Sequence, residues 1–197
     1  VVVPADSDVS NMEDFLAVYD ADPAGTPIGG GSVPGGMDHL VAAMVMEASG
    51  RDALGVNYIP YDAGGTAMAA LLSGEIKALS TGFSEAVDLA NQGEVKIIGV
   101  TSDARVDAAP DAMTMMEQGI DTTFVNWRGF FGAPGMSDEK LAQYQAAIAA
   151  MYDTDEWEAV RARNGWVNIH NPGDDFRTFL EEQETVIGDL MTKLGFL

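Results

Sequence analysis

Three β-rich runs in the first half of this sequence each lead through a turn of small residues into a helical pattern. They lie at residues 27–30, 56–61 and 76–81. A repeated strand–helix order predicts an α/β fold, with a mostly parallel sheet covered by helices on both faces. In such sheets ligands bind at the carboxyl ends of the strands, beside helix N-termini. The three turns are therefore where we expect a binding site.

The second half of the chain has a different pattern. Ser137 is placed to cap a long helix that continues to about Tyr152, and residues 174–194 form a final amphipathic helix pattern. Residues 129–135 and 166–169 are β-rich and predict two further strands. We expect a domain boundary between residues 125 and 129.

The charge of the chain excludes several classes of function. The chain has ten Lys and Arg residues and 31 Asp and Glu residues, which gives a formal net charge of −21. Such a chain is a poor partner for nucleic acid or for an anionic membrane surface, because both need basic groups. The chain has no Cys, which excludes disulfides, zinc–thiolate sites and thiol catalysis. It also lacks the spacing of a histidine zinc motif, so we expect no metal and no cofactor.

The first turn, residues 29–36, is rich in glycine but lacks the residues that define a nucleotide-binding loop. Pro34 stands where the dinucleotide fingerprint needs its third glycine, and Gly36 stands where a P-loop needs its lysine. A glycine-rich turn that enters a helix still exposes N–H groups to an anion. Gly35 and Gly36 would let a ligand approach the backbone. Anion binding and an ordinary tight turn both remain open from these residues alone.

The other two turns offer similar chemistry. Gly64 and Gly65 open the second helix, and Ser80 and Thr81 place hydroxyl groups at the third junction. Amides and hydroxyls at successive corners of one sheet can converge on one carboxylate. Their short hydrogen bonds outweigh the screened repulsion from a negatively charged chain.

Catalytic residues are not evident. The only histidines, His39 and His170, have no nucleophile elbow near them. We therefore predict that the chain is not an enzyme. The alternatives are a Rossmann-like enzyme domain that binds a phosphate ligand at residues 30–36, and a sensor or scaffold subunit.

A series of motifs, in order, resembles one family of binding proteins. The segments are residues 31–40 (GSVPGGMDHL), 59–67 (IPYDAGGTA), 71–76 (LLSGEI), 100–102 (VTS) with Arg105, 110–119 (PDAMTMMEQG), 127–129 (WRG) and 133–135 (APG). Together they resemble the Bug family, the periplasmic substrate-binding subunits of tripartite tricarboxylate transporters. The resemblance runs from near residue 1 to the C-terminus.

The resemblance implies a periplasmic-binding-protein type II-like fold of two lobes with mostly parallel sheets, the first lobe incomplete. Residues 1–126 would form the second, ligand-binding lobe, with a crossover strand at 1–4, and residues 127–197 the C-terminal part of the first lobe. It further implies a monomer in the periplasm, without the signal peptide in this chain. That monomer would capture a small organic anion and deliver it to the membrane subunits of the transporter.

Carried over by position, the ligand-binding residues would be Ser32, Gly35, Gly36, Met37, Asp38, His39, Gly64, Gly65, Ser80 and Thr81. Two residues depart from the family pattern. Met113 replaces a common proline, and Asp38 replaces a small hydroxyl residue. A carboxylate at position 38 would either weaken the binding of polycarboxylates or select a ligand able to donate a hydrogen bond.

Overall fold

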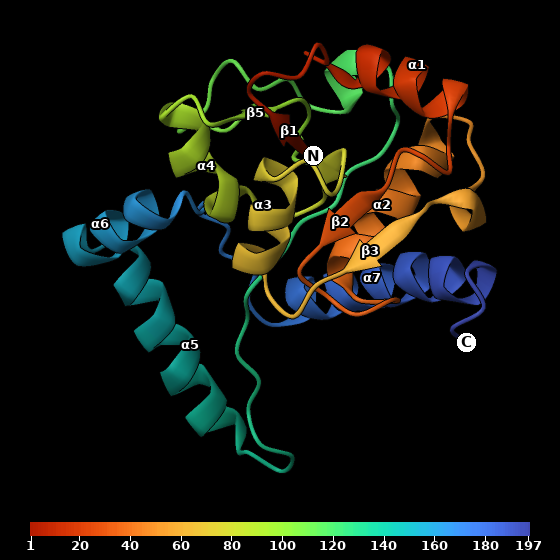
Figure 1. Ribbon diagram of the computed structural model, residues 1–197. Coiled ribbons are helices and arrows are strands. Elements are labelled where there is room, and N and C mark those ends of the chain that lie inside the picture. The colour runs from red at the N-terminus through yellow and green to blue at the C-terminus, as the bar shows by residue number, and fades with distance from the viewer. The chain divides into compact units, whose positions relative to one another are not determined.

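The computed structural model describes residues 1–197 (Figure 1). The chain folds into two compact units. The first unit comprises Val1–Val125 together with Ile187–Leu197, and the second comprises Asn126–Val186. The first unit contains the sheet and all three of the glycine-rich or hydroxyl-rich turns singled out above.

The sheet of the first unit has five strands in the order β3-β2-β4-β1-β5. The strands are β1 (Val2–Pro4), β2 (Ile28–Gly30), β3 (Tyr58–Pro60), β4 (Ala78–Leu79) and β5 (Val95–Ile97). Strand β2 pairs in parallel with β3 and β4, whereas β1 is antiparallel to both of its neighbours, β4 and β5. The expected α/β fold with a mostly parallel sheet is thus confirmed, with β1 as the strand that runs the other way.

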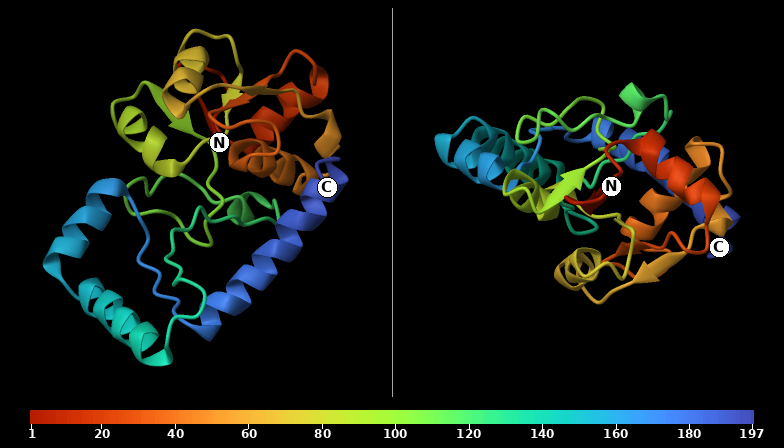
Figure 2. Two further views of the ribbon diagram at one scale, coloured as in Figure 1. Left: turned by 90° about the horizontal axis from the view of Figure 1, so that it is seen from below. Right: turned by 45° about the horizontal axis from the view of Figure 1, so that its top comes forward.

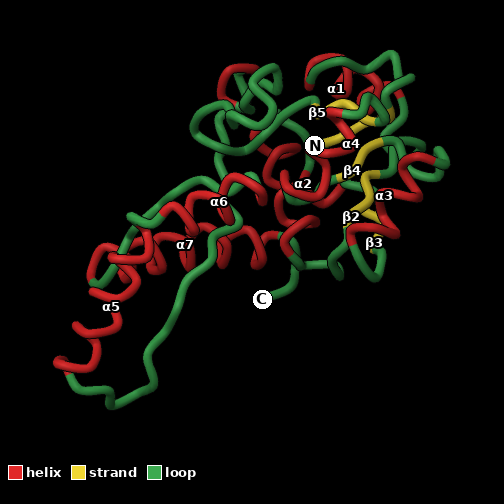
Figure 3. The backbone as a smooth tube through the Cα atoms, turned by 90° about the vertical axis from the view of Figure 1, so that its left-hand side faces the viewer, coloured by secondary structure: helices red, strands yellow, loops and turns green.

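Helices cover both faces of this sheet, as Figures 1 and 3 show. Helices α1 (Met12–Ala21) and α2 (Met37–Ala48) pack with one set of buried residues, and α3 (Gly64–Leu72) and α4 (Phe83–Asn91) with another. Successive strand residues supply the two cores: Val3 packs with α1 and α2, while its neighbour Val2 packs with α3. This alternation follows from the two-residue period of a strand. It leaves the ends of the strands, rather than the faces, open for a ligand.

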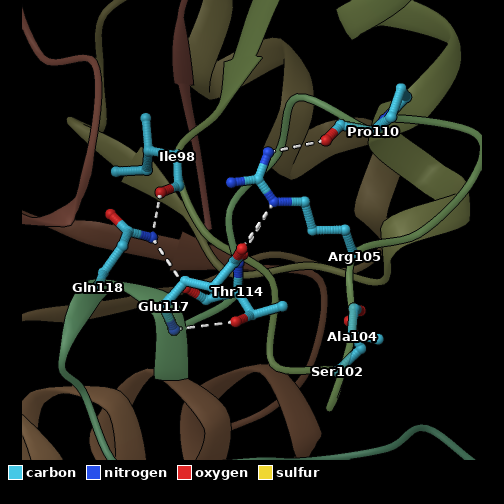
Figure 4. A network of polar contacts seen from close by, with 8 residues as sticks. All are labelled: Ile98, Ser102, Ala104, Arg105, Pro110, Thr114, Glu117 and Gln118. Carbon is cyan, nitrogen blue, oxygen red and sulfur yellow. Dashed lines mark hydrogen bonds and ion pairs between the residues drawn. The ribbon is translucent and has the colours of Figure 1, made fainter.

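The segment after β5 is held by a polar network (Figure 4). The Arg105 guanidinium contacts the Glu117 carboxylate at 2.9 Å and donates to the Pro110 carbonyl at 3.0 Å. Glu117 also accepts from the Thr114 amide, which lowers the pKa of its carboxyl, and its own amide donates to Thr114 Oγ1. Gln118 Nε2 donates to the Ile98 carbonyl at 3.0 Å. These bonds connect residues of two of the family-like motifs and anchor the chain beside the sheet.

The C-terminal turns of α7 (Asp174–Lys193) pack beside α2, as Figure 2 shows. Leu190 is buried together with Leu40 and Ala43 of α2 and with Ala53 of a short 3-10 helix. The end of the chain therefore helps to position the helix that follows the first turn.

The second unit consists of helices and coil. It contains α5 (Asp138–Tyr152), α6 (Asp155–Asn164) and the first turns of α7. Ser137 caps α5 as expected, since its hydroxyl accepts from the Lys140 amide at 3.3 Å. The strands expected at 129–135 and 166–169 are wrong, because both segments are coil apart from a turn at Pro134 and Gly135. A β-rich run becomes a strand only where another strand pairs with it, and this unit contains none.

No residue between 126 and 186 is buried. Large apolar side chains of this unit are instead open to solvent, with Phe130 79% and Phe131 70% exposed. None of the helices combines the length and the apolar character required to cross a membrane.

Candidate functional site

The first corner, residues 31–37, connects β2 to α2 and is shaped by hydrogen bonds within itself. Ser32 Oγ accepts from the Asp38 amide at 3.1 Å, and the Gly36 amide donates to the Val33 carbonyl at 2.8 Å. The Gly35 amide donates to Nδ1 of His39 at 3.0 Å. Several donors that we expected to face a ligand are therefore engaged inside the corner, where they set its shape.

Asp38 is buried at the start of α2, with 8% of its surface exposed. Burial raises the pKa of its carboxyl, and the nearby Glu85 carboxylate raises it further. Hydrogen bonds from the Gly31 amide and from Ser32 act in the opposite direction and stabilise the charged form. Asp38 thus connects the beginning of the corner to the beginning of the helix.

His39 lies between two aromatic rings. Its imidazole stacks on Tyr58 with 4.6 Å between the ring centres and meets Phe196 edge-on at 5.8 Å. His39 and Tyr58 line an open hollow of about 270 Å³ together with Pro34, Leu54 and Leu194 among others. Because Nδ1 accepts the Gly35 N–H, the imidazole that makes this bond is neutral.

Burial lowers the pKa of His39 below its ordinary value of 6.5, so the stability of the chain should depend on pH through this residue. As the pH falls below 6.5, the His39 imidazole takes up a proton in the unfolded chain, whereas in the folded chain it stays neutral to a lower pH. Protonation therefore stabilises the unfolded state, and the free energy of unfolding falls as the pH falls. We expect wild type to lose more stability than His39→Asn between about pH 7.5 and 5.5. Urea unfolding of both proteins measures this difference. Parallel pH profiles would contradict it.

The first and second corners touch through their backbones. The second corner, residues 61–66, leads from β3 into α3. A methyl group built on Gly31 would lie 2.4 Å from the Gly64 nitrogen and 2.7 Å from the Ala63 carbonyl carbon. Only glycine at position 31 allows this approach. The parallel pairing of β2 with β3, in which Ile28 lies opposite Tyr58, brings the two corners together.

The third corner, residues 80–84, meets the second through a side chain. The Thr81 hydroxyl donates to the carboxylate of Glu85, which lies in the first turn of α4. The same carboxylate lies against Gly64, since a methyl group built there would be 2.3 Å from Oε2 of Glu85. Three successive strand-to-helix corners therefore converge, as the sequence predicts for the carboxyl edge of a parallel sheet.

The ten expected ligand-binding residues do not all face one hollow. Ser80 and Thr81 line a second, smaller hollow of about 70 Å³ together with Phe83, Thr101 and others. Ser80 itself is 2% exposed, and its amide donates to the Gly29 carbonyl. His39 lines the larger hollow, on the side of Tyr58 and Phe196.

Sequence reasoning missed Glu85 and Tyr58. The Tyr58 hydroxyl donates to the Ser32 carbonyl at 2.8 Å and so supports the first corner from the neighbouring strand. An acid in the first turn of a helix is common for reasons of helix polarity, so nothing in the sequence distinguished Glu85. No group of three or more His, Asp or Glu side chains is placed to hold a metal ion.

Known proteins are similar to this chain in sequence and in fold. The sequence profile of the tripartite tricarboxylate transporter family receptor, TctC, matches residues 1–196. A UPF0065 protein in the gbd 5' region of Cupriavidus necator is 28% identical over 143 residues, which is 73% of this chain and 42% of that protein. A second UPF0065 protein, from Bordetella pertussis, is 26% identical over 144 residues, covering 72% of this chain and 44% of the relative. The chain thus spans less than half the length of these two relatives.

Solved structures share the fold. A TctC solute-binding protein from Polaromonas, without ligand, superposes with a TM-score of 0.82 at 26% identity, covering 98% of this chain and 65% of the other. A Rhodopseudomonas palustris protein with adipate gives 0.82 at 17% identity, with coverage of 98% and 64%. MatC of the same species, with bound malate, gives 0.77 at 17% identity, with coverage of 96% and 64%. These findings confirm the resemblance seen in the motifs: the chain belongs to the tripartite tricarboxylate transporter receptor family.

Proposed function

We propose that this chain is the larger part of a solute-binding protein that captures a small carboxylate in the periplasm. It would deliver that carboxylate, as a monomer, to the membrane subunits of a tripartite tricarboxylate transporter. The observation that carries the proposal is the convergence of three strand-to-helix corners at one edge of the sheet. Helix N-termini and hydroxyls gathered in this way favour an anion. The ligands named for two structural relatives, adipate and malate, are of the same chemical class.

Two parts of the chain would contribute to different lobes of that protein. They differ from the two compact units in the last residues, Ile187–Leu197, which pack in the unit of the sheet. Residues 1–126 would form the ligand-binding second lobe, with β1 as the crossover strand, and residues 127–197 would belong to the first lobe. The absence of any buried residue between 126 and 186 supports this, since a unit without a core needs further protein surface to pack against. The solved relatives are longer than this chain, which covers 65% of the Polaromonas protein.

The ten residues would then have two kinds of role. Ser32, Gly35, Gly36, Asp38 and His39 would shape the first corner, because their polar groups bond to one another there. Of the remaining five, Met37, Gly64, Gly65 and Thr81 would present their backbone amides to the ligand, and Ser80 its hydroxyl.

A binding experiment on the whole chain tests this function. In ¹⁵N-labelled protein titrated with malate and with adipate, the amide signals of Met37, Gly64, Gly65 and Thr81 should shift in a saturable manner. The amides of α1, which contributes no residue to the three corners or to either hollow, should not shift and serve as the internal control. Sodium chloride at matched ionic strength should leave all of these signals in place. No shift at the corners, or equal shifts with chloride, would refute the proposal.

The alternative of a Rossmann-like enzyme domain is not supported. The family that matches the chain is a family of receptors. In addition, the Gly35 amide and the Ser32 hydroxyl, which a phosphate would need, already have partners inside the first corner.

A further inference from the structure

Glu85 lies at the place where the three corners meet. It projects from the first turn of α4 and accepts the hydroxyl proton of Thr81. Its Oε2 also lies against the Cα atom of Gly64, at the start of α3. A carboxylate from the protein itself thus takes the Thr81 hydroxyl, a donor that a ligand carboxylate would seek at the third corner, and lies beside the second corner.

A second acid stands close by. Asp38 is buried at the first corner, and the Glu85 carboxylate is close enough to contribute to the raised pKa of its carboxyl. Neither Asp38 nor Glu85 forms a salt bridge with a lysine or arginine. The meeting point therefore combines helix N-termini, which attract anions, with two carboxylates, which repel them.

We propose that Glu85 restricts this protein to carboxylic acids that also carry a hydrogen-bond donor, namely hydroxy or amino acids. The proposal rests on the carboxylate-binding function proposed above. A bare dicarboxylate would have to displace Glu85 from the Thr81 hydroxyl or lie beside it unpaired. A ligand hydroxyl or ammonium group instead donates to Glu85, and the repulsion becomes a charge-assisted hydrogen bond.

Three acids that differ in one substituent test this selectivity. Succinate has no donor on its carbon chain, malate adds one hydroxyl group, and aspartate adds one ammonium group. Dissociation constants for the whole chain come from saturation of the amide shifts. We expect wild type to bind malate or aspartate at least about tenfold more tightly than succinate, the effect of one hydrogen bond to a charged group.

The variant Glu85→Gln keeps the size of the side chain and removes its charge. It should bind succinate more tightly than wild type and reduce the preference for the donor-bearing acids to less than about threefold. Asp88→Asn is the matched control, because Asp88 is an exposed acid on the same helix. It removes the same charge and should leave the preference intact. An unchanged amide spectrum away from the corners shows that each variant is folded.

The outcomes separate the two proposals. Equal affinity of wild type for all three acids, or a preference that survives in Glu85→Gln, would overturn the selectivity while the carboxylate-binding function stands. Loss of the preference in Asp88→Asn as well would show that only net charge matters, which also overturns it. If no acid binds to wild type or to the variants, the proposed function itself fails, and the selectivity with it.

Discussion

Gly31→Ala should lower the free energy of unfolding by about 1–3 kcal/mol, the cost of forcing an extra group into a packed site. The added methyl group would overlap the Gly64 nitrogen at 2.4 Å and the Gly64 Cα atom at 2.8 Å. Both atoms belong to the backbone, so no side chain can rotate away to relieve the overlap. The first and second corners would have to separate. Urea unfolding measures the loss of stability, and we expect the carboxylate-induced shifts at Gly64 and Gly65 to disappear with it.

Gly65→Ala is the matched control. It lies one residue after Gly64 in the first turn of α3, and a methyl group there meets nothing within 4 Å. Its backbone is not in the left-handed region, so alanine should change stability little or raise it by up to about 1 kcal/mol. If Gly31→Ala is as stable as Gly65→Ala, the two corners do not touch in solution.

Hydrogen exchange should divide the chain into a protected and an unprotected part. We expect amides of α5 and α6 to exchange at least about 100-fold faster than those of β2 and α2, because local opening is easiest where no core resists it. The sheet unit buries side chains such as Phe15 and Leu71 almost completely, whereas no residue between 126 and 186 is buried. Exchange monitored by NMR or by mass spectrometry of peptides resolves the two parts.

Helix α7 offers an internal control, because it belongs to both parts. Its residues from Ile187 onward pack with α2, and Leu190 is 6% exposed, while its earlier turns belong to the second unit. Protection should therefore rise along this single helix toward its C-terminus. Equal protection throughout α5, α6 and the sheet would show that the second unit has a stable structure of its own.

Much of the first unit could be predicted from the sequence. Helix α2 ends two residues before Gly50 and α3 two residues before Gly74, and both glycines have positive φ, near 80°. Such signals are local, because a glycine in the left-handed region ends a helix whatever lies around it. The order of strands and helices was readable for the same reason.

The second unit contains two segments for which the prediction from sequence was wrong. Residues 129–135 and 166–169 have the composition of strands but contain no strand in the structure. Strand formation depends on a partner in the sheet far more than on composition. The helices α5 and α7, which satisfy their hydrogen bonds internally, were predicted correctly in the same part of the chain.

The sequence by itself determined the α/β class, the three corners and the family, since each depends on residues that are neighbours in the chain. Only the tertiary structure decided that Gly31 touches Gly64, that Glu85 lies across the second and third corners, and that His39 turns toward Tyr58 and Phe196. These contacts join residues far apart in the sequence. The approach of Gly31 to Gly64 depends on the register between the parallel strands β2 and β3, and the contact of His39 with Phe196 depends on the packing of α7 beside α2; no local pattern specifies either.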